Sequence, residues 1–176
     1  MNIFILNTGR CGSTTFIKAC QLIQNYSAGH ESRVTETGDR RLAYPDNHIE
    51  ADNRLSWFLG QLDRKYADNA FYVHLMRDRD KTAASFIKRA DYGIMRAYQQ
   101  GILQDVDTRL NIHDVALDYI DTVTDNIKHF LKNKTHKMDF RLENANEDFI
   151  KFWRSINAEG DLTKALQEWC IAYNAS

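Results

Sequence analysis

Nine residues near the start of the chain combine the groups that bind phosphate. Segment 7–15 reads Asn-Thr-Gly-Arg-Cys-Gly-Ser-Thr-Thr and directly follows an apolar run. Its two glycines allow backbone torsions closed to other residues, so that N–H groups can approach a ligand closely. Three hydroxyl residues stand where a helix is expected to begin, and helix N-termini favour anions. We predict an anion site made of Gly9, Arg10, Cys11, Gly12, Ser13, Thr14 and Thr15.

The spacing within this segment excludes two familiar phosphate sites. An ATP-binding P-loop needs Gly-x-x-x-x-Gly-Lys-Ser/Thr, and no lysine follows Gly12. A cysteine-phosphatase loop would need an arginine six residues after Cys11, where the chain has Ile17. Cys11 is therefore expected to donate through its backbone rather than to act as a nucleophile. Two interpretations of the segment remain: an anion-binding loop with Arg10 between the glycines, or a plain glycine turn with a serine cap.

A second candidate site follows the apolar run at residues 71–76. Arg77 comes directly after this run, and Ser85 lies eight residues later on an expected helix. An arginine at the carboxyl end of a strand can make a bidentate, charge-assisted contact with phosphate. The serine hydroxyl can approach the same anion from the helix. The alternative is that Arg77 pairs with Asp78 or Asp80 in a surface charge cluster, which contributes little to stability.

The elements that would position these residues can be read from apolar patterns. Continuous apolar runs predict buried strands at residues 3–6 and 71–76, and weaker signals suggest strands at 27–30 and 137–142. Residues 31–52 are polar and contain the only proline, so we expect an irregular surface segment there. Helical spacing of apolar residues occurs at 16–23, 55–66, 117–130, 149–156 and 162–173.

Strands that alternate with helices predict an α/β fold. We expect three layers, with a central, mostly parallel sheet and helices on both faces, forming a single domain over residues 1–176. In such folds ligands bind at the carboxyl ends of the strands. The loops after Leu6 and Met76 would therefore meet at one edge of the sheet.

Composition limits the remaining classes of function. A formal net charge of −1 gives no overall field for nucleic acid, so any polyanion site must be local. Three scattered cysteines fit neither a disulfide framework nor a zinc site, and we expect no metal. The first apolar run is too short for a signal sequence or a membrane span. These features predict a cytoplasmic protein with reduced thiols and no membrane association.

The two candidate sites together resemble those of PAPS-dependent sulfotransferases, which use 3′-phosphoadenosine 5′-phosphosulfate. Residues 8–15 resemble the 5′-phosphosulfate loop of that family, and residues 72–86 resemble its strand with arginine and later serine. The resemblance implies the family's P-loop-like architecture, with Arg10 at the bridging oxygen and 5′-phosphate. It also implies that Arg77 and Ser85 hold the 3′-phosphate. The resemblance is specific over residues 3–16 and 71–86.

The same resemblance implies a base that takes the proton of the acceptor hydroxyl. Histidine serves in some sulfotransferases and glutamate in others, and His30 and Glu31 follow an expected strand end. We prefer Glu31, because His30 can belong to the strand end and point inward. The polar segment 31–52 suggests a polar acceptor such as a carbohydrate, although another small molecule stays open. The sequence sets no oligomeric state.

The chain also departs from the family. It has no Gly-x-x-Gly-x-x-Lys/Arg segment near its C-terminus, so part of the adenosine enclosure is unassigned. Trp57 falls on the apolar stripe of residues 55–66, which predicts a core position rather than stacking on adenine.

Two competing functions follow from the same residues. An ATP-dependent small-molecule kinase with an atypical phosphate loop would need magnesium and a metal-binding acid near a strand end. A binding module for the 3′,5′-bisphosphate would keep Arg77 and Ser85 and need no base.

Overall fold

The computed structural model describes residues 1–171 and 173. Its core is a five-stranded sheet in the order β2-β3-β1-β4-β5, in which every pair of neighbours is parallel. The strands are β1 (Asn2–Leu6), β2 (Ser27–His30), β3 (His48–Ala51), β4 (Ala70–Met76) and β5 (Lys137–Arg141). The four strands expected from the sequence are all present, and a fifth joins them.

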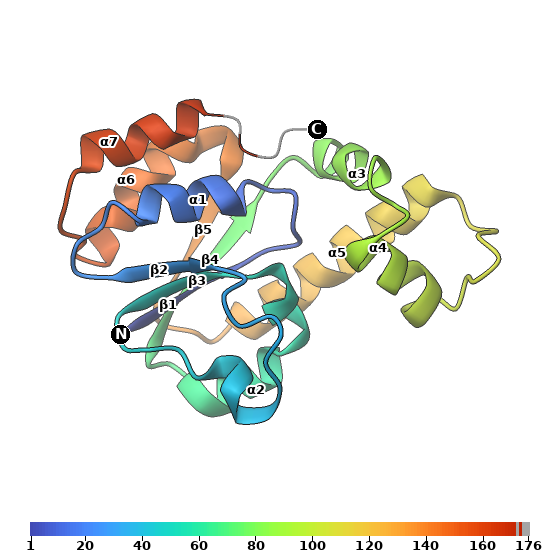
Figure 1. The fold of residues 1–176 in the computed structure, drawn as a ribbon, viewed down its shortest axis with the longest axis horizontal. Coiled ribbons are helices and arrows are strands. Elements are labelled where there is room, and N and C mark those ends of the chain that lie inside the picture. The colour runs from blue at the N-terminus through green and yellow to red at the C-terminus, as the bar shows by residue number, and fades with distance from the viewer. Residues whose placement is uncertain (172, 174–176) are drawn as a thin grey trace.

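Helices cover both faces of the sheet, which confirms the expected three-layer α/β fold (Figure 1). In the described part of the chain, the α-helices are α1 (Ser13–Cys20), α2 (Leu59–Tyr66), α3 (Arg79–Ile87), α4 (Gly93–Ala97), α5 (Ile112–Leu131), α6 (Ala145–Ser155) and α7 (Leu162–Gln167). Helices α1, α6 and α7 lie on one face and α2 and α5 on the other. Each face has its own apolar core, because the central strands are buried on both sides.

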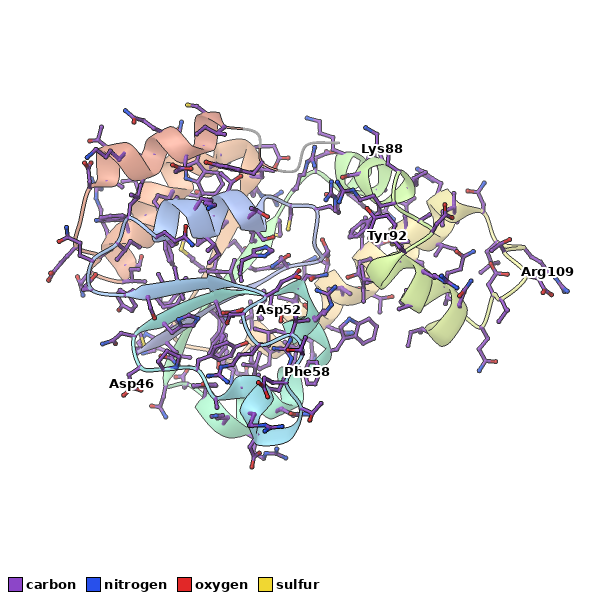
Figure 2. The ribbon with its side chains drawn as sticks, in the orientation of Figure 1. Asp46, Asp52, Phe58, Lys88, Tyr92 and Arg109 are labelled. Atoms are coloured by element: carbon purple, nitrogen blue, oxygen red, sulfur yellow. The ribbon has the colours of Figure 1, made fainter. Side chains whose placement is uncertain are left out.

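Shorter helical turns complete the path of the chain. They are the 3₁₀ helices η1 (Gly38–Leu42), η2 (Asn53–Trp57), η4 (Leu142–Asn144) and η5 (Glu168–Cys170), and the π-helical turn η3 (Tyr98–Ile102). Together with α4, η3 forms part of a projection that the sequence did not predict. Figure 2 shows Tyr92 at the base of this projection and Arg109 at its far end.

The expectation of an irregular surface segment at residues 31–52 was wrong. This segment contains β3, which pairs with β1 and β2 and is buried along its whole length. His48 and Glu50 hid the strand, because titratable side chains are unusual at buried positions. Both are paired within the fold: the Glu50 carboxylate contacts His48 Nε2 at 2.9 Å and accepts from Ser32.

The single helix expected at residues 55–66 is also broken in two. The chain forms η2, turns at Phe58 and continues as α2. Because of this break, Trp57 leaves the apolar stripe and is 43% exposed, so its predicted core position was wrong. The helix expected at residues 162–173 is α7 followed by η5, which ends at Cys170. Residue 172 of this prediction lies outside the described residues.

Candidate functional site

The carboxyl ends of β1 and β4 lie side by side at the centre of the sheet. After β1 the chain crosses to β2 at one edge, and after β4 it continues toward β5 at the other. This divergence opens a crevice, the usual ligand position in open α/β sheets. A pocket of about 550 Å³ lies here, lined by residues from both predicted sites. Its volume falls within the range of small-molecule sites.

Segment 7–15, called the phosphate loop below, adopts the torsions that its glycines predicted. Gly9, Arg10 and Gly12 have φ values of 88°, 59° and 91°. Asn7 fixes the start of the loop, because its Oδ1 accepts from Gly9 N at 2.9 Å. Tyr119 on α5 donates to the Thr8 carbonyl at 2.8 Å. These two hydrogen bonds fix the start of the loop. Helix α1 begins at Ser13 with its N-terminus toward the pocket.

The two predicted sites adjoin each other. Arg10 Nε donates to Ser85 Oγ at 2.9 Å, and Arg77 Nη1 donates to the Arg10 carbonyl at 3.1 Å. Burial and the nearby charges of Arg89 and Arg77 lower the pKa of Arg10. An arginine side chain keeps its proton in proteins, so Arg10 supplies a fixed positive charge.

Arg77 does not belong to the acidic surface cluster that was its alternative. Asp78 instead caps α3 by accepting from Lys81 N at 2.9 Å, and Asp80 lies 4.0 Å from Arg79. Arg77 itself lines the pocket.

Cys11 belongs to the phosphate loop, but it is not among the described residues that line the pocket. The residue is buried, and burial raises the pKa of its thiol to about 12. A thiol that stays protonated is a poor nucleophile. This agrees with the expectation that Cys11 does not react.

Helix α3 and the residue that follows it add two cations that sequence reasoning missed. Lys81 and Lys88 line the pocket on either side of Ser85, and Figure 2 shows Lys88 at the end of this helix. The spacing of four and then three residues places all three on one helix face. That spacing was the available signal.

The charge of the pocket differs from that of the whole chain. Among the described residues that line it, four are cationic (Arg10, Arg77, Lys81 and Lys88) and none carries a carboxylate. The chain as a whole has a formal net charge of −1. Four cations within one pocket repel one another, so the arrangement suits a ligand that carries several negative charges.

The C-terminal part of the described chain forms an apolar and aromatic wall of the same pocket. This wall comprises Leu142, Trp169, Cys170, Ile171 and Tyr173. Trp169 stacks on Phe140 of β5, with ring centroids 5.3 Å apart. The sequence assigned none of these residues to the site. The wall could not be predicted, because it depends on how α7 and η5 pack against α1.

The two candidate bases have different surroundings at the end of β2. His30 Nε2 lies 3.0 Å from Ser13 Oγ, so this ring reaches the phosphate loop. Glu31 has a φ of 52° and its carboxylate pairs with Arg54 Nη1 at 3.0 Å. A non-glycine residue in this left-handed region costs of order 1–3 kcal/mol and needs support from its neighbours.

Glu50 gives that support from within the sheet. Its carboxylate accepts from Ser32 N at 2.7 Å and from Ser32 Oγ at 2.6 Å. Gly29 makes room for this contact, since a Cβ there would lie 2.8 Å from Glu50 Oε2. The buried carboxylate therefore fixes the backbone that carries His30 and Glu31.

In residues 1–171 and 173, no helix combines the length and apolarity that crossing a bilayer requires. The same residues contain no group of three or more histidine, cysteine or acidic side chains that could hold a metal. The three cysteines are free; Cys11 and Cys20 are buried and Cys170 is exposed.

Comparison with known proteins identifies the fold. The chain matches no family model and no curated protein sequence. Among solved structures it is similar to a sulfotransferase domain from the curacin biosynthetic pathway, with a TM-score of 0.68 and 16% identity. The alignment covers 94% of this chain and 76% of that one. The chain therefore has a sulfotransferase-like fold.

Proposed function

We propose that the protein is a sulfotransferase that takes the sulfuryl group of 3′-phosphoadenosine 5′-phosphosulfate to an acceptor hydroxyl. The observation that carries the proposal is the pocket at the ends of β1 and β4, where the described lining residues include four cationic side chains and no acidic one. The nucleotide carries anionic groups at both its 3′ and 5′ positions, which matches two adjoining cationic sites. The sulfotransferase-like fold supports the same conclusion.

The residues divide into roles by their place in the pocket. Arg10, the phosphate-loop amides and the start of α1 suit the 5′-phosphate and the charge that develops on it as sulfur departs. Arg77 and Ser85 suit the 3′-phosphate, with Lys81 and Lys88 adding positive potential. The wall that includes Trp169 and Tyr173 offers the apolar surface that a purine base needs.

The base is assigned to His30 or Glu31. Contact with Ser13 supports His30, because that serine begins α1 at the phosphate loop. The Glu31 carboxylate is engaged by Arg54 and would have to share that contact in order to accept a proton. This geometry favours His30 over the sequence-based preference for Glu31.

An ATP-dependent kinase is less well supported. The acid nearest the end of β3 is Asp52, which Figure 2 shows in the central part of the molecule. One of its oxygens pairs with buried Arg41, and the other accepts from Arg54 N at 2.8 Å. A carboxylate committed to these contacts is poorly placed to hold magnesium.

The test is a thermal-shift measurement with 3′,5′-bisphosphoadenosine and, separately, with ATP and magnesium. At one hundred times its dissociation constant, a ligand stabilises the fold by about 2.7 kcal/mol. We expect a clear shift with the bisphosphate and little with ATP. A larger, magnesium-dependent shift with ATP would overturn the proposal.

Two variants show whether the binding uses the predicted site. Arg77→Ala removes a charge-assisted contact of about 1.5–3 kcal/mol and should weaken bisphosphate binding about 10- to 150-fold. Ser85→Ala should cost less, because the hydroxyl is neutral. Wild-type affinity in both variants would show that the 3′-phosphate assignment is wrong. Binding of the bisphosphate without turnover on any acceptor would instead indicate the alternative function, a non-catalytic bisphosphate-binding protein.

A further inference from the structure

An exposed tryptophan stands one helical turn from the ion pair beside the candidate bases. Trp57 and Arg54 lie three residues apart on η2, and side chains at this spacing eclipse each other in a 3₁₀ helix. The residues between them, Leu55 and Ser56, are buried. Asp52 and Phe58, on either side of η2, mark its place in Figure 2. Trp57 and Arg54 therefore share the outward face.

This face continues to the phosphate loop. Arg54 pairs with Glu31 at 3.0 Å, and the neighbouring His30 contacts Ser13 at 3.0 Å. One 3₁₀ turn advances about 6 Å along the helix axis, which is about the length of one sugar ring. A ligand of one or two rings could thus lie on Trp57 and reach the candidate bases.

We propose that Trp57, Arg54 and Glu31 bind a carbohydrate, one hydroxyl of which is the acceptor; this proposal rests on the proposed function. The face of an indole carries negative potential and attracts the slightly positive C–H groups on the flat side of a pyranose. Sugar hydroxyls can donate to the Glu31 carboxylate and accept from the Arg54 guanidinium. Within the described part of the chain, the Arg54 side-chain contacts use Nη1, which leaves Nε and Nη2 to donate.

The ion pair favours a hydroxylated acceptor over an apolar aromatic one. Both side chains are about one-third exposed and keep part of their hydration. A phenol or steroid lying over them would remove this water without replacing its hydrogen bonds, which costs free energy. Sugar hydroxyls replace those hydrogen bonds while the ring covers Trp57.

The transfer step is balanced without a redox partner. The sugar oxygen forms a bond to sulfur as the bond from sulfur to the bridging phosphate oxygen breaks. The hydroxyl proton goes to His30 or Glu31, and the electron pair of the broken bond stays on the phosphate oxygen near Arg10. The products are a sugar sulfate ester and the 3′,5′-bisphosphate.

The experiment offers sulfur-labelled PAPS with two sets of acceptors. One set holds cellobiose, maltose and N,N′-diacetylchitobiose, and the other holds phenol and 2-naphthol. We expect label in a saccharide, with KM for that sugar rising about tenfold in Trp57→Ala while kcat changes little. Trp57→Phe keeps an aromatic face and should restore most of the affinity. Saturation-transfer NMR should show contact with the sugar C–H protons in the wild type and lose it in Trp57→Ala.

The outcomes separate this proposal from the proposed function. Label in the phenols, label in none of the saccharides, or an unchanged KM in Trp57→Ala would each overturn the carbohydrate proposal. Bisphosphate affinity should be the same in wild type, Trp57→Ala and Trp57→Phe. Failure of all three to bind bisphosphate would instead overturn the proposed function.

Discussion

The proposed donor side of the site, formed by the phosphate loop and α3, is assembled from two continuous stretches of sequence. The proposed acceptor side, formed by residues 27–32 and η2, depends on contacts between segments far apart in the chain. Arg10, Arg77 and Ser85 meet because β1 and β4 are neighbours. Glu50 from β3 holds the adjoining Ser32, and Arg54 from η2 pairs with Glu31.

This difference shows which part of a site can be predicted from local sequence and which part cannot. A phosphate cradle needs backbone N–H groups and fixed charges, which glycines and arginines supply wherever a strand ends at a helix. A base needs a particular side chain held in one orientation. For the candidate bases this depends on the contacts of Ser13 with His30 and of Arg54 with Glu31. The two sides should therefore respond separately to mutation, which the following predictions test.

The largest effect is expected from the base. His30→Ala should reduce turnover by about 10²–10⁴, the usual contribution of a positioned base. Glu31→Gln keeps the shape of the side chain but cannot take the proton, and should do less damage. Affinity for the 3′,5′-bisphosphate, measured by calorimetry, should be unchanged in both variants. The reverse order of damage would identify Glu31 as the base, and an equal loss of bisphosphate affinity would mean that the two sides are not separate.

A smaller effect is expected from Glu50, the buried carboxylate that supports the backbone next to the candidate bases. Glu50→Gln replaces one acceptor oxygen by a donor that faces Ser32 or His48, so a buried contact is lost. The free energy of unfolding should fall by about 1–3 kcal/mol in urea denaturation. Turnover should fall as well, because the backbone at Glu31 loses its support.

Ser32→Ala is the matched control for Glu50, since it removes the hydroxyl contact and keeps the contact from the Ser32 amide. It should lie between wild type and Glu50→Gln in both measurements. Bisphosphate affinity should be unaffected in the folded variants. Unchanged turnover in a destabilised Glu50→Gln would show that this carboxylate supports the fold alone.

The fold could be predicted where burial left a continuous apolar run. Residues 3–6 and 71–76 show such runs because β1 and β4 are covered on both faces. β3 is equally buried but contains His48 and Glu50, whose partners Ser27 and Ser32 are visible only in the folded chain. A sequence pattern cannot show that a buried charge is paired.

The site divides in the same way. Arg10, Gly12 and Ser85 line the pocket and could be brought together from spacing, because each lies between a strand and the next helix or on that helix. Gly9, which was predicted with them, is not among the described residues of the lining. Trp57 was assigned to the core because one helix was expected where η2 and α2 meet at Phe58. The break between the two helices at that residue, rather than the apolar pattern, decides which side chains face outward.

The smallest effect is expected at Lys81, which tests whether the donor side extends beyond its motif. Lys81 is exposed and lines the pocket one turn before Ser85. A point charge in water contributes less than a partly buried guanidinium, so Lys81→Ala should weaken bisphosphate binding only about two- to fivefold. The loss should shrink as salt is raised, because screening at 1 M extends over only about 3 Å. Lys18→Ala, in the last turn of α1 and outside the pocket lining, is the control for net charge and should not change the affinity. If Lys81→Ala and Lys18→Ala behave alike at low salt, Lys81 does not belong to the donor side. A loss at Lys81 as large as that at Arg77, and insensitive to salt, would instead mean that the lysine contacts the phosphate directly.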